Sequence, residues 1–233
     1  MFDRIKKAFS RPPAGSEPSA DGGEAAADHN RISEWAQTQG WGFVEQGGGR
    51  KFALEGSVLG RPWRLEQGRP SREFIHGEEL RVRAELGIDD DVSILVMNRP
   101  LKEALEKKAY GIFTDSLQTT ADPRLPEELR WLTMFPEVGW ESLPNLFWSR
   151  YAVLSDDRDN ALAWLDMALA EQLMDWPHPA HNAQVPFMLM LMRGKAYLRM
   201  EYNPPEMPVL QHATRVFTLA CEKAIIAPLS GRG

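Results

Sequence analysis

Alternating apolar and polar residues run through much of the segment 41–98 and predict a series of short strands. Side chains at every second position of a strand point to the same face of a sheet. Turns containing glycine and proline, at residues 60–62 and 68–71, separate the alternating segments. We expect an antiparallel β-meander with one face on a core and the other in water. Its inward positions are Phe52, Leu54, Trp63, Leu65, Leu80, Val82, Ala84 and Leu86.

The last segment of this series, residues 92–97, is apolar in both phases of the alternation. A strand of this kind is usually covered on both faces. We therefore place it centrally in the sheet or beneath a helix, as the strand that closes the meander.

Apolar residues spaced three and four apart predict helices elsewhere in the chain. Capping residues such as Asp157, and the stops Gly40 and Pro177, set the expected ends. The expected helices run from Asp28 to Gly40, from Pro100 to Tyr110, from Pro126 to Phe135, from Ser155 to Pro177 and from Met207 to Ile226.

Three further strands are expected in the second half, at residues 147–154, 185–192 and 196–202, with a tight turn at Arg193-Gly194-Lys195. This half is thus β-α-β-β-α. Because strands and helices alternate without a regular βαβ repeat, the fold class we expect is α+β with a mostly antiparallel sheet.

The chain divides into segments of different composition. Residues 1–10 form a short amphipathic arm, and residues 11–28, rich in Pro, Gly, Ser, Ala and acids, are expected to be a disordered linker. We expect one α+β domain over 29–226, with two subdomains at about 29–110 and 145–226 as the alternative. Residues 227–233 are a tail.

The arm gathers Phe2, Ile5 and Phe9 on one helical face, with Lys6 and Lys7 available to the other side. Such a segment can lie on an anionic membrane surface. The alternatives are a frayed helix or a segment that docks on the chain's own core. Two helical turns with three apolar side chains bind a bilayer weakly.

Composition excludes several classes of protein. Residues AVILMFWYC make up 43% of the 233 residues, enough to bury a core, and the net charge is -6. The sequence has neither an apolar run of membrane-spanning length nor a signal peptide. Its one cysteine, Cys221, excludes a disulfide framework within one chain and fits a reducing cytoplasm.

The segment 175–181 brings together Asp175, His178 and His181, residue types that can bind zinc. Pro177 and Pro179 prevent the helix that would align two histidines on one face, and no third ligand with motif spacing follows. We therefore expect a surface loop here, and hold these residues only as weak metal candidates.

Other chemical patterns are incomplete. The segment 89–91 lacks the glycine and distal glutamate of a calcium loop, and 47–51 lacks the Gly-Lys-Ser/Thr ending of a phosphate loop. In 56–60 the serine is misplaced for a nucleophile elbow. We expect no cofactor, and we favour binding over catalysis.

Charge is unevenly distributed. Residues 50–83 hold eight bases and five acids, a local excess of three positive charges in a chain of net charge -6. Arg64, Arg81 and Arg83 could form a basic face on the wetted side of the sheet for an acidic partner or a phosphate. Cross-strand ion pairing with the interleaved glutamates is nevertheless the default expectation, and nucleic acid is the less favoured partner.

Several strings of residues resemble those of uncharacterised bacterial α+β domains with a helix-Gly-Trp entry and a Gly-x3-Gly-Arg hairpin. They are Ala36-x3-Gly40-Trp41-x-Phe43, Leu54-Glu-Gly56, Gly60-Arg61-Pro62 and residues 151–157. This resemblance covers about two thirds of the chain and consists of turn and core residues. It implies a fold and no activity. More loosely, the order helix, strands, helix resembles small acidic secretion chaperones.

These observations favour a non-catalytic bacterial binding protein in the cytoplasm, held at the inner face of the membrane by its arm. We expect a protein partner, and the oligomeric state stays open. One alternative is a homodimeric assembly factor similar to a secretion chaperone. Another is an enzyme with a dispersed site, which a cluster of titratable groups in one apolar cleft would favour.

Overall fold

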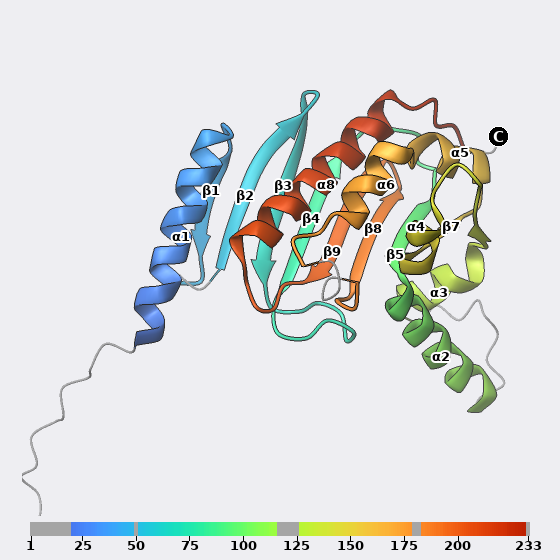
Figure 1. Ribbon diagram of the computed structural model, residues 1–233, viewed down its shortest axis with the longest axis horizontal. Coiled ribbons are helices and arrows are strands. Elements are labelled where there is room, and N and C mark those ends of the chain that lie inside the picture. The colour runs from blue at the N-terminus through green and yellow to red at the C-terminus, as the bar shows by residue number, and fades with distance from the viewer. Residues whose placement is uncertain (1–19, 49–50, 116–125, 179–182, 232–233) are drawn as a thin grey trace, which may run out of the picture.

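The computed structural model describes residues 20–48, 51–115, 126–178 and 183–231. Within them nine strands form one sheet, with helices on both of its faces (Figure 1). Every strand pairing is antiparallel. The predicted fold class, α+β with a mostly antiparallel sheet, is therefore confirmed.

Neighbouring strands follow the order β1-β2-β3-β4-β9-β8-β5-β7-β6 across the sheet. The strands are β1 (Gly42–Gln46), β2 (Lys51–Val58), β3 (Arg61–Gly68), β4 (Glu79–Glu85), β5 (Ile94–Asn98), β6 (Glu137–Val138), β7 (Tyr151–Ser155), β8 (Phe187–Met192) and β9 (Lys195–Glu201).

The predicted meander is correct for β1 to β4 and wrong for its last strand. Instead of pairing with β4, β5 lies between β8 and β7, because the β8–β9 hairpin is inserted beside β4. All five residues of β5 are buried, as the prediction of a central strand requires. Alternation in a sequence indicates which face a side chain occupies, but it does not determine which strand lies alongside.

The predicted turn between β8 and β9 forms at Arg193 and Gly194, whose φ angles are 53° and 72°. Two successive residues with positive φ are typical of the tight hairpin turns that match strand twist. The hairpin register follows, with Met192 opposite Lys195.

The first face of the sheet is covered by five helices: α1 (Ala20–Thr38), α4 (Asn145–Arg150), α5 (Arg158–Trp164), α6 (Met167–Met174) and α8 (Met207–Ile226). Buried residues of these helices and of the sheet make one large core. The predicted strand alternation is visible in it, since Leu54, Leu65 and Val82 are cross-strand neighbours and all are buried. The indole N–H of Trp164 donates to the carbonyl of Ala220 at 2.9 Å and links α5 to α8.

The second face is covered over β5, β7 and β8 by α2 (Arg99–Asp115) and α3 (Glu127–Met134). Met188, Met190 and Met192 of β8 point to this side and pack in a second, smaller core. Flexible methionine side chains fill irregular gaps between a sheet and crossing helices.

Over β1 to β4 the second face is polar and lies beyond the helices described for this side, and β9 forms its border, where Tyr197 packs against the second core. We call this half the open sheet face. It carries the charged side chains of Lys51, Glu55, Arg64, Glu66, Glu79, Arg81, Arg83, Glu85, Lys195, Arg199 and Glu201.

Several predicted boundaries need correction. The strand predicted at 147–154 is helix α4 as far as Arg150, followed by β7. Phe147 and Tyr151, four residues apart, stack at 5.4 Å between ring centroids. That spacing places both rings on the same side of a helical turn. Burial of both rings outweighed the strand propensity of this aromatic segment.

The single helix predicted from Ser155 to Pro177 is two helices, α5 and α6. Asp157 caps the first as predicted, and Asp166 starts the second by accepting the backbone N–H of Leu169 at 3.0 Å. An aspartate between two helical segments favours a new N-terminus, because its side chain bonds to free backbone N–H groups. The apolar pattern alone spans this break.

Two helices are longer than predicted. α2 reaches Asp115 rather than Tyr110, and α1 begins at Ala20, so residues 20–28 are helical rather than part of a disordered linker. Alanine and glutamate in 24–27 have high helix propensity, which the linker composition obscures. Residues 1–19 lie outside the described residues, and the proposed division into arm, linker and domain stays a prediction.

Candidate ligand-binding pocket

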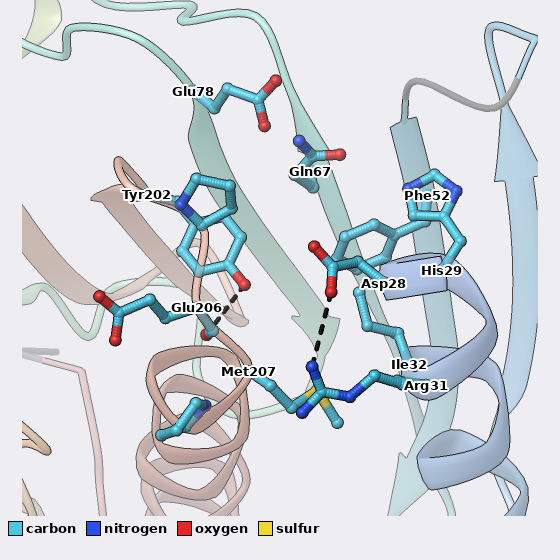
Figure 2. Close-up of a pocket in the computed structure, with 12 residues that line it drawn as sticks. Asp28, His29, Arg31, Ile32, Phe52, Gln67, Glu78, Tyr202, Glu206 and Met207 are labelled. Carbon is cyan, nitrogen blue, oxygen red and sulfur yellow. Dashed lines mark hydrogen bonds and ion pairs between the residues drawn. The ribbon is translucent and has the colours of Figure 1, made fainter. Parts of the chain in front are cut away.

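A pocket of about 510 Å³ lies on the first face, between α1 and the start of α8. Figure 2 shows α1 on one side of it and Tyr202 with the start of α8 on the other, with Gln67 and Glu78 at one end. The lining residues are Asp28, His29, Arg31, Ile32, Phe52, Gln67, Glu78, Tyr202, Pro205, Glu206, Met207 and Pro208.

Elements far apart in the sequence position these side chains. α1 presents Asp28 to Ile32, and the inward phase of β2 and β3 presents Phe52 and Gln67. Tyr202 follows β9, and its backbone N–H donates to the carbonyl of Glu78 at 2.8 Å. That bond ties together the two chain segments that close one end of the pocket.

The wall of the pocket is partly apolar. Ile32, Phe52 and Tyr202 are all buried, and Met207 is partly buried beside them. The rings of His29 and Phe52 meet edge to face at 5.6 Å. Surfaces of this kind suit the apolar body of a ligand, whereas polar groups fix its orientation.

Gln67 is the unusual residue of this wall. It continues the inward phase of Trp63 and Leu65 along β3 and is only 6% exposed. Its side-chain oxygen is buried and, within the described part of the chain, has no hydrogen-bond partner. Buried polar atoms in native proteins are nearly always paired, so this acceptor lacks a donor that a ligand could supply.

Glu78 provides a second unpaired acceptor. Its Oε2 atom is buried and has no hydrogen-bond partner among the described residues, and the carboxylate makes no ion pair with them. Burial raises the pKa of Glu78, and the positive charges of Lys51 and His29 offset only part of this rise. The carboxyl group is therefore held in an environment that disfavours its charge.

Most other polar groups of the pocket have partners. Tyr202 donates its hydroxyl to the carbonyl of Glu206 at 3.0 Å, and burial raises the pKa of this phenol. His29 Nδ1 lies 3.3 Å from a carboxylate oxygen of Glu45, outside the pocket. An Arg31 guanidinium nitrogen is 3.6 Å from an Asp28 oxygen. The unmet hydrogen-bonding capacity is thus concentrated at Gln67 and Glu78.

Of the three weak metal candidates, the structure describes Asp175 and His178. Asp175 ends α6 and is exposed, while His178 bonds to a Glu206 carboxylate oxygen at 2.8 Å. His181 lies outside the described residues. Among the residues that the structure describes, no three His, Cys, Asp or Glu side chains are arranged to hold a metal ion.

The candidate basic residues share the open sheet face. Arg64 is directly opposite Arg83 on β4, and Arg81 is opposite Arg199 on β9. Each is near a glutamate: Arg64 contacts Glu55 and Glu66, an Arg81 nitrogen is 3.6 Å from Glu66, and an Arg83 nitrogen is 3.8 Å from Glu85. The pairs Arg64–Glu55 and Arg81–Glu66 join neighbouring strands, as the default expectation requires, whereas the other two pairs lie within one strand. Binding of an acidic partner here stays a prediction.

The candidate membrane contacts Phe2, Ile5, Lys6, Lys7 and Phe9 lie outside the described residues. No helix in the described part of the chain combines the length and apolarity needed to cross a membrane. The location of the protein at a membrane therefore stays a prediction.

Other titratable groups have structural roles. His212 is buried, its Nε2 atom is 2.8 Å from the Gln172 carbonyl, and burial lowers its pKa. Burial raises the pKa of the Cys221 thiol, so this cysteine is not a thiolate nucleophile. Asp89 accepts the backbone N–H groups of Asp91 and Gly231, which lowers its pKa and stabilises a turn.

Sequence reasoning did not identify the pocket. One signal was present, because Gln67 is a polar residue in the inward phase of a strand whose other inward residues are apolar. Glu78 carries no such signal, since it lies in the loop before β4.

Comparisons with known proteins give little further information. No family model matches the chain. No curated protein matches it by sequence. The crystal structure of the mycobacterial trehalose monomycolate transport factor A is similar at 11% sequence identity and a TM-score of 0.49, covering 88% of this chain and 98% of that one. Similarity this low is too weak to transfer a function. The resemblance to uncharacterised bacterial α+β domains therefore stays a prediction.

Proposed function

We propose that this protein binds a ligand without transforming it, and that the pocket between α1 and α8 holds this ligand. The observation that carries the proposal is that two residues lining one pocket, Gln67 and Glu78, each have a buried acceptor, Oε1 and Oε2, without a partner in the described structure. A pocket of about 510 Å³ is in the range that small-molecule sites occupy.

The energetic argument rests on the cost of unpaired polar groups. A buried acceptor without a donor costs roughly 1–3 kcal/mol. A ligand that donates to Gln67 and Glu78 recovers part of this cost in the complex. The apolar atoms of the ligand also gain free energy of binding when they are buried against Phe52 and Ile32.

An enzyme is the second candidate, because titratable groups do cluster in this partly apolar pocket. Against catalysis, the described groups form no nucleophile and base in hydrogen-bond contact. The Tyr202 hydroxyl donates to a backbone carbonyl, and His29 is engaged by Glu45 on the far side. Glu78 has the raised pKa expected of a general acid, but no described residue forms a nucleophile and base pair with it.

A fragment screen by ¹H–¹⁵N NMR tests the proposal. Fragments that carry hydrogen-bond donors are expected to shift signals of residues 28–32, 67, 78, 202, 203, 206 and 207. The substitution Met207→Trp should fill the pocket and abolish these shifts. Met134→Trp is the matched control, because Met134 is 62% exposed and lies on α3 at the second face.

Shifts confined to the pocket, lost in Met207→Trp and kept in Met134→Trp, support the proposal. Shifts that persist in Met207→Trp, or that occur only elsewhere, overturn it. Each bound fragment is then incubated with the protein and its mass is measured. An unchanged mass supports binding, and a changed mass establishes the enzyme instead.

A further inference from the structure

The pocket selects the chemistry of its ligand through hydrogen bonding. Both orphaned atoms, Gln67 Oε1 and Glu78 Oε2, are acceptors, so the complementary ligand group is a donor. Gln67 is more than nine-tenths buried and lines the pocket, so the donor must enter the protein to reach it.

The charges around the pocket select the sign of that donor. Three carboxyl groups line it, those of Asp28, Glu78 and Glu206. Arg31 lies close to Asp28, and His178 pairs with Glu206 from outside. Glu78 is left without a neutralising cation at ion-pair distance in the described structure.

A positively charged hydrogen-bond donor on the ligand would supply the cation that Glu78 lacks in the described structure. Hydrogen bonds between an ammonium or guanidinium group and a carboxylate are roughly twice as strong as neutral ones. The aromatic rings of Phe52 and Tyr202 also line the pocket, and ring faces attract organic cations. The side chains of Ile32 and Met207 give apolar contact for the stem that carries the charge.

We infer that the α1–α8 pocket takes an organic cation, an ammonium or guanidinium group on an apolar stem, with Glu78 and Gln67 receiving its N–H donors. This inference rests on the proposed function, because it names the ligand class of the same site. The same chemistry is present in free amines and in lysine or arginine side chains of a peptide.

Proton binding should compete with the cation at Glu78. The charged and titratable groups that line the pocket with this carboxyl are Asp28, His29 and Arg31 of α1, Tyr202 and Glu206, and Lys51 of β2 lies near it. Because burial raises the pKa of Glu78, its carboxylate takes up a proton at a higher pH than an exposed glutamate does. A protonated carboxyl loses its attraction for a cation, so affinity should fall as the pH is lowered through this pKa.

The probe for the test is dansylcadaverine, a primary amine on a five-carbon stem with a fluorescent aromatic body. Its neutral N-pentyl analogue and an analogue ending in a carboxylate have nearly the same size. Fluorescence titration of the full chain should show the amine binding about tenfold or more tightly than the neutral analogue. The carboxylate analogue should bind weakest.

The variant Glu78→Gln keeps the shape of the side chain and removes its charge. We expect it to weaken binding of the amine about tenfold and to leave the neutral analogue unchanged. Glu34→Gln is the matched control, since it removes one negative charge from an exposed position of α1 outside the pocket lining. Urea unfolding curves of both variants serve as the control that each is folded.

Selective loss of amine binding in Glu78→Gln, with Glu34→Gln unaffected, supports the inference. Equal binding of the amine and its neutral analogue overturns the inference but leaves the proposed function standing. If no analogue binds and the fragment screen is also negative, both fail. Competition by acetyl-Leu-Lys-Leu amide assigns the cation to a peptide, and competition by free cadaverine alone assigns it to a small amine.

Discussion

The α1–α8 pocket and the open sheet face both carry charged side chains, and they differ in how those charges are satisfied. On the open sheet face, Arg64 contacts both Glu55 and Glu66, and Lys195 lies 3.1 Å from Glu85. In the pocket, Glu78 and Gln67 keep buried oxygens without partners in the described structure.

This difference teaches that an excess of one charge in a sequence does not mark a binding site. In the basic stretch 50–83, Arg64 pairs with Glu55 and Arg81 with Glu66 across neighbouring strands, whereas Arg64–Glu66 and Arg83–Glu85 are pairs within one strand. Exposed pairs of this kind contribute about 0–1 kcal/mol each and are screened by salt. A site is indicated better where residues with unpaired buried polar groups line a pocket.

The largest expected effect comes from the most buried pair of the open sheet face. Glu79 is fully buried, and its Oε1 atom accepts from Arg199 at 2.9 Å. Arg199→Met keeps the stem and leaves the Glu79 carboxylate without its cation. We expect the free energy of unfolding to fall by about 3 kcal/mol, because a buried charge loses its partner.

Urea unfolding followed by fluorescence measures this loss. Arg83→Met is the control on the same face, since its side chain is 64% exposed and lies 3.8 Å from Glu85. It should change stability by less than about 0.5 kcal/mol. Similar losses in the two variants would contradict the assignment of Glu79 and Arg199 as a buried pair.

In the pocket, a substitution should raise the free energy of unfolding instead of lowering it. Gln67→Met removes an unpaired acceptor and keeps the length of the side chain. The variant should be more stable than the wild type by about 1 kcal/mol, because no hydrogen bond of the orphaned oxygen is lost. It should also bind dansylcadaverine more weakly. A loss of stability in the ligand-free protein would show that Gln67 has a partner within the fold.

The smallest effect concerns the pH dependence of stability. Glu78 has a pKa above its ordinary value of 4.5 in the folded protein. Below that ordinary value both the folded and the unfolded chain hold the proton. As the pH rises, the unfolded chain loses its proton first, and the free energy of unfolding falls until the folded pKa is passed.

Glu78→Gln does not titrate, so it should be more stable than the wild type at about pH 7.5 and nearly equal to it at about pH 4. The gain is about 0.5 kcal/mol or less, because the group is partly exposed and screened by solvent. Urea unfolding at the two pH values checks the sign. A gain that grows as the pH falls would contradict burial as the cause of the raised pKa.

Local patterns predicted most of the elements of this fold. The meander β1 to β4, the β8–β9 hairpin and α8 follow from alternation, turn residues and a helical stripe. The wrong predictions occur where one sequence pattern is compatible with two different structures. The aromatic segment 147–154 suits either a strand or a helix, and the apolar stripe of 158–174 continues through the cap residue Asp166.

Local sequence patterns do not predict the pocket, because its walls come from α1, β2, β3 and the start of α8. No spacing along the chain relates Gln67 to Glu206. Whether a carboxylate such as Glu78 has a partner depends on which side chains surround it in space.

The sequence by itself determined the α+β class, the inward face of the strands and the turns that join them, because these depend on interactions between residues close together in the chain. Only the tertiary structure decided that β9 and β8 separate β4 from β5, and which glutamates of neighbouring strands Arg64 and Arg81 meet. It alone brought Gln67 and Glu78 to one pocket without partners in the described chain. The reason is physical, since strand neighbours, ion pairs and burial are contacts between distant segments, and these form only when the whole core packs.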